Sequence, residues 1–144
     1  MNYVLDTNIL VHILTGSKIG MEVNAKIQES NPYFVISIVT KAEIISLAKQ
    51  RKWGERKLTQ LNSLLEKLLI IPIDNEEIVE VYAEMDAYSQ GKLKDKPLGL
   101  TSRNMGKNDL WIAATTYLTK AILLTTDNDF KHLESEYISV ENLN

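Results

Sequence analysis

Short apolar runs alternate along the chain with longer segments in which apolar residues recur every three or four positions. Residues 3–5 form an apolar run that ends at a polar triplet, residues 6–8, which is typical of a buried strand that leads into a helix. Residues 33–39 are aromatic and β-branched, which predicts a second strand after a turn at Asn31-Pro32. Three further strands are predicted at residues 70–73, 121–126 and 138–140.

The helical spacing of apolar residues predicts helices between these strands. The clearest case is residues 57–69, where leucines recur at three- and four-residue steps. A helix that opens at Thr40 also has an apolar stripe. Residues 91–108 hold three of the six glycines and are predicted to form one long irregular stretch, which is typical of functional or mobile loops. The remaining helices are predicted after residue 6 and at residues 75–88 and 109–118.

Strands that alternate with helices predict an α/β fold with a mostly parallel central sheet covered on both faces. The length of 144 residues suits one domain. No internal repeat or linker divides the chain, so we expect a single domain over residues 1–144. Hydrophobic residues make up 44% and charged residues 24%, which are ordinary values for a globular protein.

The absence of cysteine narrows the possible chemistry. It excludes a disulfide framework, a thiol nucleophile and every cysteine-based zinc or iron–sulfur site. No segment offers the run of about 20 apolar residues that a membrane span needs. The first residues lack the basic region of a signal peptide, so we expect a soluble, cytoplasmic protein.

Acidic residues stand where the predicted strands end. Asp6 follows the first strand, and Asp127 and Asp129 follow the fourth. Asp109 starts the helix after the long irregular stretch, and Glu43 lies in the first turn of the helix after the second strand. In open parallel sheets, ligands bind outside the carboxyl ends of the strands. We therefore expect these acids to meet at one edge of the sheet.

Such a cluster has chemical consequences. Clustered carboxylates repel one another, and their pKa values rise unless cations neutralise them. Oxygen ligands without His or Cys suit Mg²⁺ or Mn²⁺. These ions lower the pKa of water and stabilise the attacking and leaving oxygens of a phosphate displacement. The acidic set therefore predicts metal-assisted hydrolysis of phosphodiester bonds.

Each acid also has a purely structural explanation. Asp6 fits a helix cap, and Asp109 fits the first turn of a helix, where the helix dipole favours negative charge. Glu43 lies three residues after Thr40, so the two fit a capping box. The acids after the fourth strand fit a turn whose side chains bond their own backbone. The functional interpretation depends on all of them meeting at one place.

Four segments carry a resemblance to a known family. The chain resembles the PIN domain, and more narrowly the VapC-type toxin ribonucleases, over nearly its whole length. The four segments occur in the order and at the intervals of the family's motifs: VLDTN at 4–8, TKAEI at 40–44, GKNDLWIAA at 106–114 and TTDNDF at 125–130.

The resemblance implies a PIN-like three-layer α/β/α fold and an Mg²⁺- or Mn²⁺-dependent endoribonuclease. It implies four residues that are catalytic and bind the metal: Asp6, Glu43, Asp109 and Asp127. It makes Asp129 a further metal ligand and leaves open which acid of this turn is the main one. It gives a role in holding the carboxylates to three polar residues: Thr7, Asn8 and Thr126.

The resemblance also implies partners, namely an RNA substrate, a second copy of the chain in a homodimer, and a small antitoxin that covers the site. Two other functions stay open. One is a PIN nuclease that processes RNA or cuts DNA without an antitoxin. A small antitoxin reading frame directly upstream would support the toxin instead. The other is a non-catalytic module that binds RNA or protein. Clustered carboxylates argue against the second, because a pure binder has no use for them beside a phosphate site.

The net charge of −3 counts against nucleic acid as a partner, but it averages over unlike segments. Residues 49–57 contain five Lys or Arg against one acid, and residues 91–108 contain the same excess. A solvated surface explains the first run equally well. The second leads directly into Asp109, so we expect its cations to bind RNA phosphates. These cations are Lys92, Lys94, Lys96, Arg103 and Lys107.

The two histidines, His12 and His132, raise the alternative of a metal-free ribonuclease. That mechanism needs both rings in one site. His12 lies in an apolar helical segment and His132 in a polar one, so we do not expect it.

Overall fold

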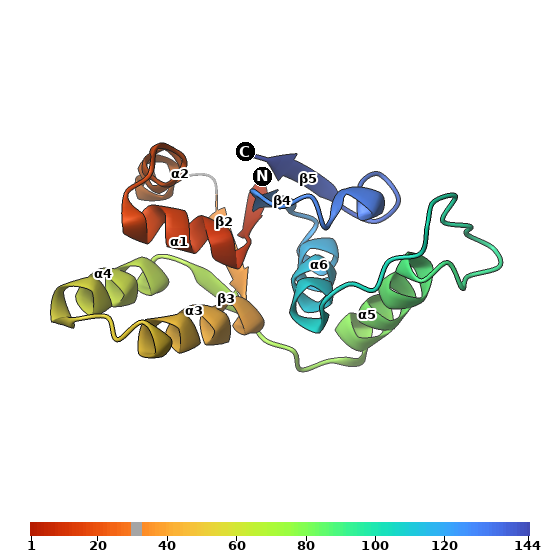
Figure 1. Cartoon of the computed structure of the whole chain (residues 1–144), viewed down its shortest axis with the longest axis horizontal. Coiled ribbons are helices and arrows are strands. Elements are labelled where there is room, and N and C mark those ends of the chain that lie inside the picture. The colour runs from red at the N-terminus through yellow and green to blue at the C-terminus, as the bar shows by residue number, and fades with distance from the viewer. Residues whose placement is uncertain (30–32) are drawn as a thin grey trace.

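The computed structural model describes residues 1–29 and 33–144 (Figure 1). The turn predicted at Asn31-Pro32 lies outside the described residues. Five strands form one parallel sheet in the order β3-β2-β1-β4-β5. Their bounds are Asn2–Leu5 (β1), Tyr33–Ser37 (β2), Leu69–Ile71 (β3), Ile122–Thr125 (β4) and Ser139–Asn142 (β5).

The direction of strand addition reverses between β1 and β4. The chain adds β2 and then β3 on one side of β1, and it later places β4 and β5 on the other side. In the register of the two central pairs, Val4 lies beside both Val35 and Leu123. Because all the strands are parallel, their carboxyl ends share one edge, and the reversal opens a crevice there.

Helices cover both faces of the sheet (Figure 1). The helices that contribute to the first core cluster are α1 (Thr7–Thr15), α2 (Lys18–Gln28), α3 (Ile38–Gln50) and α4 (Glu55–Glu66). Those that contribute to the second are α5 (Glu76–Ser89), α6 (Lys107–Thr119) and the short 3₁₀ helix η1 (Lys131–Leu133). The predicted three-layer α/β/α arrangement is therefore confirmed.

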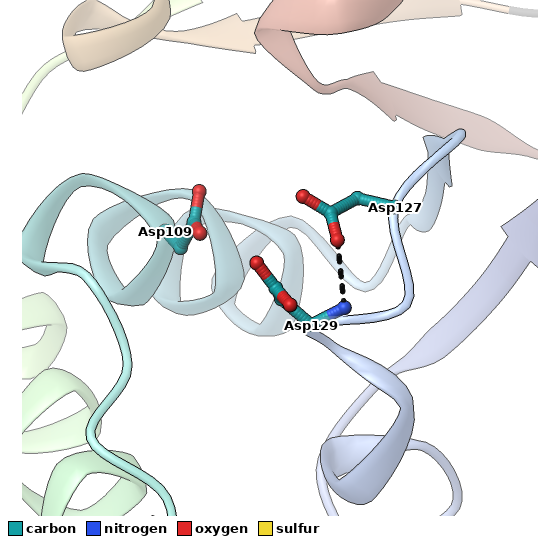
Figure 2. Close-up of side chains that lie close together, drawn as sticks. All are labelled: Asp109, Asp127 and Asp129. Carbon is teal, nitrogen blue, oxygen red and sulfur yellow. Dashed lines mark hydrogen bonds between the residues drawn. The ribbon is translucent and has the colours of Figure 1, made fainter.

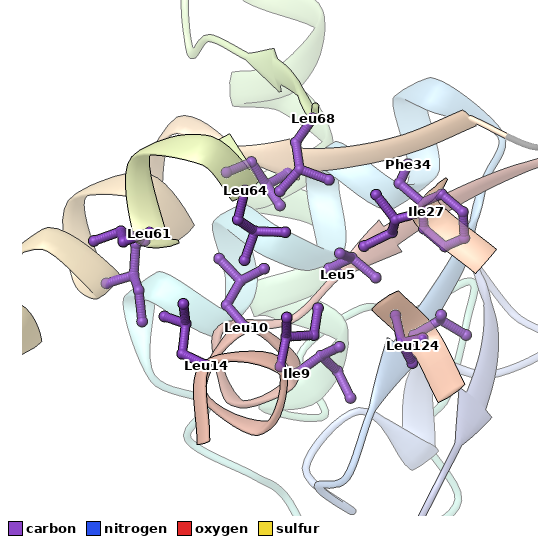
Figure 3. Close-up of a cluster of buried hydrophobic side chains, with 14 of the residues drawn as sticks. Leu5, Ile9, Leu10, Leu14, Ile27, Phe34, Leu61, Leu64, Leu68 and Leu124 are labelled. Carbon is purple, nitrogen blue, oxygen red and sulfur yellow. The ribbon is translucent and has the colours of Figure 1, made fainter. Parts of the chain in front are cut away.

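Neighbouring strand residues face opposite clusters, which explains why the strand segments are continuously apolar. Leu5 and Leu124 belong to the cluster beneath α1 and α4 (Figure 3). Val4 and Leu123, one residue earlier in each strand, belong to the cluster beneath α5 and α6. A parallel sheet covered on both faces buries both sides of each strand.

Three local predictions were wrong. The helix after β2 begins at Ile38 rather than at Thr40, because the side chain of Ser37 caps it by accepting from the N–H of Val39 at 3.1 Å. The strand predicted to reach residue 39 therefore ends at Ser37. Glu43 consequently lies in the second turn of α3, and the proposed capping box with Thr40 does not form.

A fourth error concerns α2, because no helix was predicted over these residues. This helix has a sparse buried stripe, consisting of Gly20, Val23 and Ile27. It packs closely on α1, and a side chain at Gly20 would overlap the backbone carbonyl of His12. The other predicted strands and helices are present, with ends shifted by one to three residues.

The irregular stretch between α5 and α6 is confirmed, and residues 91–106 contain no helix or strand. Several contacts attach it to the body of the protein, including those of Lys96 and Arg103. Lys96 lies 3.9 Å from the carboxylate of Glu84 and 4.3 Å from the ring centroid of Tyr137. Further along, the N–H of Arg103 donates to the carbonyl of Ser89 at 2.7 Å.

Within the described ranges, none of the helices combines the length and the apolar character needed to cross a membrane.

Candidate metal-dependent active site

Three aspartates converge at the carboxyl edge of the sheet. Asp109 lies in the first turn of α6, while Asp127 and Asp129 lie in the turn that follows β4. Each offers a carboxylate oxygen, and these oxygens all lie within 4.8 Å of one another. Figure 2 shows the three side chains pointing into a common space between α6 and this turn.

The electrostatics of this cluster fit a bound cation. Burial, followed by the negative charges of Asp6, Asp127, Asp129 and Glu43, raises the pKa of Asp109 to about 7. Among the described residues no Lys or Arg makes an ion pair with any of these carboxylates. Uncompensated carboxylates with converging oxygens are the ligand set that Mg²⁺ and Mn²⁺ prefer. The residues present therefore fit a divalent cation.

Asp6 is the best-supported carboxylate of the site. It lies between β1 and α1, is 4% exposed, and accepts from the N–H of Thr7 at 2.8 Å. Its other oxygen accepts from Nδ2 of Asn8 at 3.1 Å and from the hydroxyl of Thr125 at 2.8 Å. Burial raises the pKa of Asp6, and the hydrogen bonds from Thr125 and Thr7 oppose that rise.

Glu43 reaches the site from α3 and is held by two side chains. Thr7 donates its hydroxyl to Oε1 at 2.6 Å, and Asn108 donates from Nδ2 to Oε2 at 3.2 Å. Thr7 therefore serves two carboxylates, one through its backbone and one through its side chain. The negative charge of Glu43 contributes to the raised pKa values of both Asp6 and Asp109.

The turn after β4 is shaped by hydrogen bonds to its own carboxylate and to β5. Asp127 accepts from the N–H of Asp129 at 2.9 Å (Figure 2). Asn142, the last residue of β5, donates to the carbonyl of Asp127 at 3.1 Å and to the side chain of Asn128 at 3.0 Å. The predicted local turn therefore exists, and it presents Asp127 and Asp129 together to Asp109.

The structure brings all five predicted acids to one edge, and Asp129 stands with Asp109 and Asp127 in the convergent group. The supporting residues differ from the prediction at one position. Thr126 contributes its backbone N–H, which donates to Asn8 at 3.2 Å, while the hydroxyl beneath Asp6 belongs to Thr125. The alternation of side chains along β4 was the signal that could have distinguished these two threonines.

Asn108 was not among the predicted site residues, although it stands directly before Asp109 in the third motif. Its hydrogen bond to Glu43 links the start of α6 to α3. Both residues border a shallow depression that is also lined by Thr7, Val39 and Leu47.

The predicted basic residues divide into two groups. Arg103 lines a cleft of about 310 Å³ together with Asp109 and Asp129, and Lys107 lines an adjoining depression with Glu43. Lys96 instead contacts Glu84 and Tyr137. Lys92 and Lys94 are exposed on the irregular stretch and line neither of these two depressions.

The two histidines do not share a site. The ring of His12 is bonded to Ser17 at 2.7 Å in the connection between α1 and α2. The ring of His132 is bonded to Ser89 at 2.7 Å in the core beneath α5. This separation agrees with the expectation that no two-histidine mechanism operates here.

The sequence model of the PIN domain family matches residues 3–136 of this chain. Ribonuclease VapC1 of Haemophilus influenzae is 28% identical to the chain over 125 residues, which cover 87% of this chain and 86% of that protein.

Two solved structures share the fold over almost their entire length. The VapBC2 structure from Rickettsia felis, bound to a DNA fragment from their promoter, gives a TM-score of 0.75 at 26% identity and covers 100% of both chains. The VapBC-1 structure from nontypeable Haemophilus influenzae gives a TM-score of 0.72 at 25% identity, with 99% of this chain and 98% of that chain covered.

Proposed function

Because this chain belongs to the PIN domain family, we propose that it is a metal-dependent endoribonuclease and the toxin of a type II toxin–antitoxin pair. The observation that carries the proposal is the convergence of Asp109, Asp127 and Asp129 at the reversal point of a parallel sheet. The similarity to a VapC ribonuclease over 87% of the chain supports RNA as the substrate.

The residues that would hold the cation are Asp109, Asp127 and Asp129, with Asp6 and Glu43 bordering them. A divalent cation bound there would lower the pKa of water and would offset the negative charge that develops on the phosphate. The chain's own polar residues fix the carboxylates. Thr125 and Asn8 orient Asp6, while Thr7 orients Glu43.

Arg103 and Lys107 are proposed to bind the RNA backbone beside this cluster, because both line depressions that contain Asp109. Contacts between Lys or Arg and phosphate supply affinity without reading base sequence. They also make binding weaken as salt concentration rises.

A small antitoxin protein is the proposed macromolecular partner. The support is the similarity to chains in two VapBC toxin–antitoxin structures, each covered over at least 98% of its length. A homodimer is proposed on the same resemblance.

RNA cleavage with Mg²⁺, with Mn²⁺ and with EDTA tests the enzymatic part. We expect cleavage by the wild type with either metal, and none with EDTA. Asp6→Asn and Asp127→Asn should abolish activity, because each removes a negative charge from the cluster. Asp74→Asn changes an exposed acid just before α5 and serves as the matched control. Cleavage that persists with EDTA and in Asp6→Asn would contradict a metal-dependent mechanism at this cluster.

Expression in a bacterium that lacks any antitoxin tests the toxin part. The wild type should arrest growth, and Asp127→Asn should not. Normal growth in the presence of folded wild-type protein would remove the toxin assignment while leaving the nuclease assignment to the cleavage assay.

A further inference from the structure

Ser89 connects three segments near the active site. It is the last residue of α5 and is fully buried. Its hydroxyl lies 2.7 Å from Nε2 of His132 and donates to Sδ of Met105 at 3.4 Å. Its carbonyl accepts from the N–H of Arg103 at 2.7 Å. One residue thus joins α5 to η1 and to the segment 103–106 that leads into α6.

This polar pair is buried in an apolar environment. His132 is 6% exposed, and both ring and hydroxyl lie at the cluster that contains Met85, Tyr88 and Leu133. Nδ1 of His132 has no hydrogen-bond partner within the described ranges. Burying polar groups costs free energy unless they are hydrogen-bonded, and a buried polar pair fixes one arrangement of the segments it joins. The pair therefore holds the joined segments in one arrangement, although two apolar side chains of the same size would cost less free energy to bury.

The pair contacts the segment 103–106 through Sδ of Met105, and the backbone carbonyl of Ser89 holds the N–H of Arg103 in the same segment. Arg103 lines the cleft that contains Asp109 and Asp129. Burial, and then the positive charge of Arg103, lowers the pKa of His132. In the described part of the chain Arg103 makes no ion pair. Its guanidinium therefore remains available for an anion next to the acidic cluster.

We infer that Ser89 and His132 are positioning residues that hold the segment 103–106 so that Arg103 contacts a phosphate of the RNA beside the metal cluster. The inference rests on the proposed function for its substrate. A guanidinium matches phosphate geometry through paired N–H donors, which makes its orientation matter more than that of a lysine.

A double-mutant cycle measures whether Ser89 acts through Arg103. Ser89→Ala should lower kcat/KM for RNA cleavage about tenfold, because small misplacements of a substrate-binding group are costly. In the Arg103→Ala background, Ser89→Ala should cause no further loss. An equal loss in both backgrounds would show that Ser89 acts by another route. Thr116→Val is the matched control, since it removes a buried hydroxyl that bonds only within α6.

Variants of His132 separate positioning from general packing. His132→Gln keeps a nitrogen where Nε2 lies and should preserve activity, whereas His132→Asn places its nitrogen nearer the position of Nδ1 and should behave like Ser89→Ala. If Asn and Gln were equally active, the bond to Ser89 would have no role.

Two readouts without catalysis complete the test. In Ser89→Ala, amide hydrogen exchange should speed up in residues 103–106 and stay unchanged in α3. The salt dependence of single-stranded RNA binding should flatten by about 0.7 in log–log slope, as expected for the loss of one phosphate contact. Unchanged exchange and an unchanged slope would overturn the inference even if wild-type protein cleaves RNA. A wild type that does not cleave RNA would instead overturn the proposed function, and the exchange result would still decide the positioning role.

Discussion

The hydroxyl of Thr125 donates a 2.8 Å hydrogen bond to the carboxylate of Asp6 across the junction of β4 and β1. The same hydroxyl accepts from the N–H of Asp127 at 3.0 Å. Thr125 thus links the carboxylate that follows β1 to the turn that follows β4, and it does so from a fully buried position.

Thr125→Val should disturb both the fold and the site. It removes a donor to a buried carboxylate, which we expect to lower the free energy of unfolding at pH 7 by about 1–3 kcal/mol. Loss of such a supporting contact should also weaken Mn²⁺ binding about 10–100-fold. Denaturant unfolding and calorimetric titration with Mn²⁺ measure the two effects. Thr125→Ser keeps the hydroxyl and should resemble the wild type, so equal behaviour of Val and Ser would contradict this role.

The raised pKa of Asp109 predicts how stability depends on pH without a cation. The folded protein keeps this proton up to about pH 7, whereas the unfolded chain loses it near 3.8. The folded state therefore binds more protons between these values, and stability should fall as pH rises through this window. Melting temperatures in EDTA at pH 5 and pH 8 measure the effect.

Asp109→Asn should flatten that pH dependence, and Mn²⁺ at pH 8 should restore stability to the wild type by neutralising the cluster. The same slope in Asp109→Asn and the wild type would show that other groups cause it.

The contact between Thr7 and Glu43 predicts a specific kinetic change. Thr7→Val removes the hydroxyl that donates to Glu43, while the backbone N–H that serves Asp6 remains. We expect kcat for RNA cleavage to fall about tenfold, the range seen when partners of metal-site ligands are lost. KM should change little, because Thr7 lines neither of the depressions that contain Arg103 and Lys107. Thr7→Ser is the control, and an equal fall in kcat for Ser and Val would refute the role of the hydroxyl.

The basic residues should differ in their contribution to RNA binding. Lys107→Ala should flatten the salt dependence of RNA affinity by about 0.7 in log–log slope, because it removes one cation next to Glu43. Lys96→Ala should leave that slope nearly unchanged, since its ammonium lies on Tyr137 and beside Glu84. Fluorescence anisotropy at several salt concentrations separates the two. A larger change in slope for Lys96→Ala than for Lys107→Ala would indicate that RNA binds near Lys96 and not beside Glu43.

Close packing of α1 and α2 makes Gly20 sensitive to substitution. In Gly20→Ala the added methyl would overlap the carbonyl of His12, so the helices must separate. We expect a loss of about 1–3 kcal/mol in the free energy of unfolding, as for other overpacked sites. Gly54→Ser is the comparison, because nothing lies near that position and Ser is a good helix cap. Similar unfolding midpoints for both variants would contradict the packing argument.

The sequence was sufficient to predict the sheet and the meeting of the acids, because parallel strands bring their carboxyl ends to one edge. It was not sufficient where two equivalent residues compete. Ser37 and Thr40 are both good helix caps, and the choice depends on where β2 stops pairing with β3 at Ile71. Thr125 and Thr126 are neighbours of the same residue type. They differ in that the side chain of Thr125 faces Asp6, which depends on how β4 pairs with β1.

Contacts between distant segments were also beyond the sequence. Lys96 carries the same charge as its neighbours in the irregular stretch, yet its partners Glu84 and Tyr137 come from other parts of the chain. The bond between Ser89 and His132 spans 43 positions and gave no local signal.

The pairing of β1 with β4 has a consequence for synthesis of the protein. Thr125 lies 119 positions after Asp6, and two of the three converging aspartates come later still. A nascent chain on the ribosome cannot assemble the cluster until β4 and its turn have emerged. A chain in which β4 and its turn are still missing therefore lacks Asp127, Asp129 and the hydroxyl that supports Asp6, so the separate carboxylates cannot yet act together on RNA.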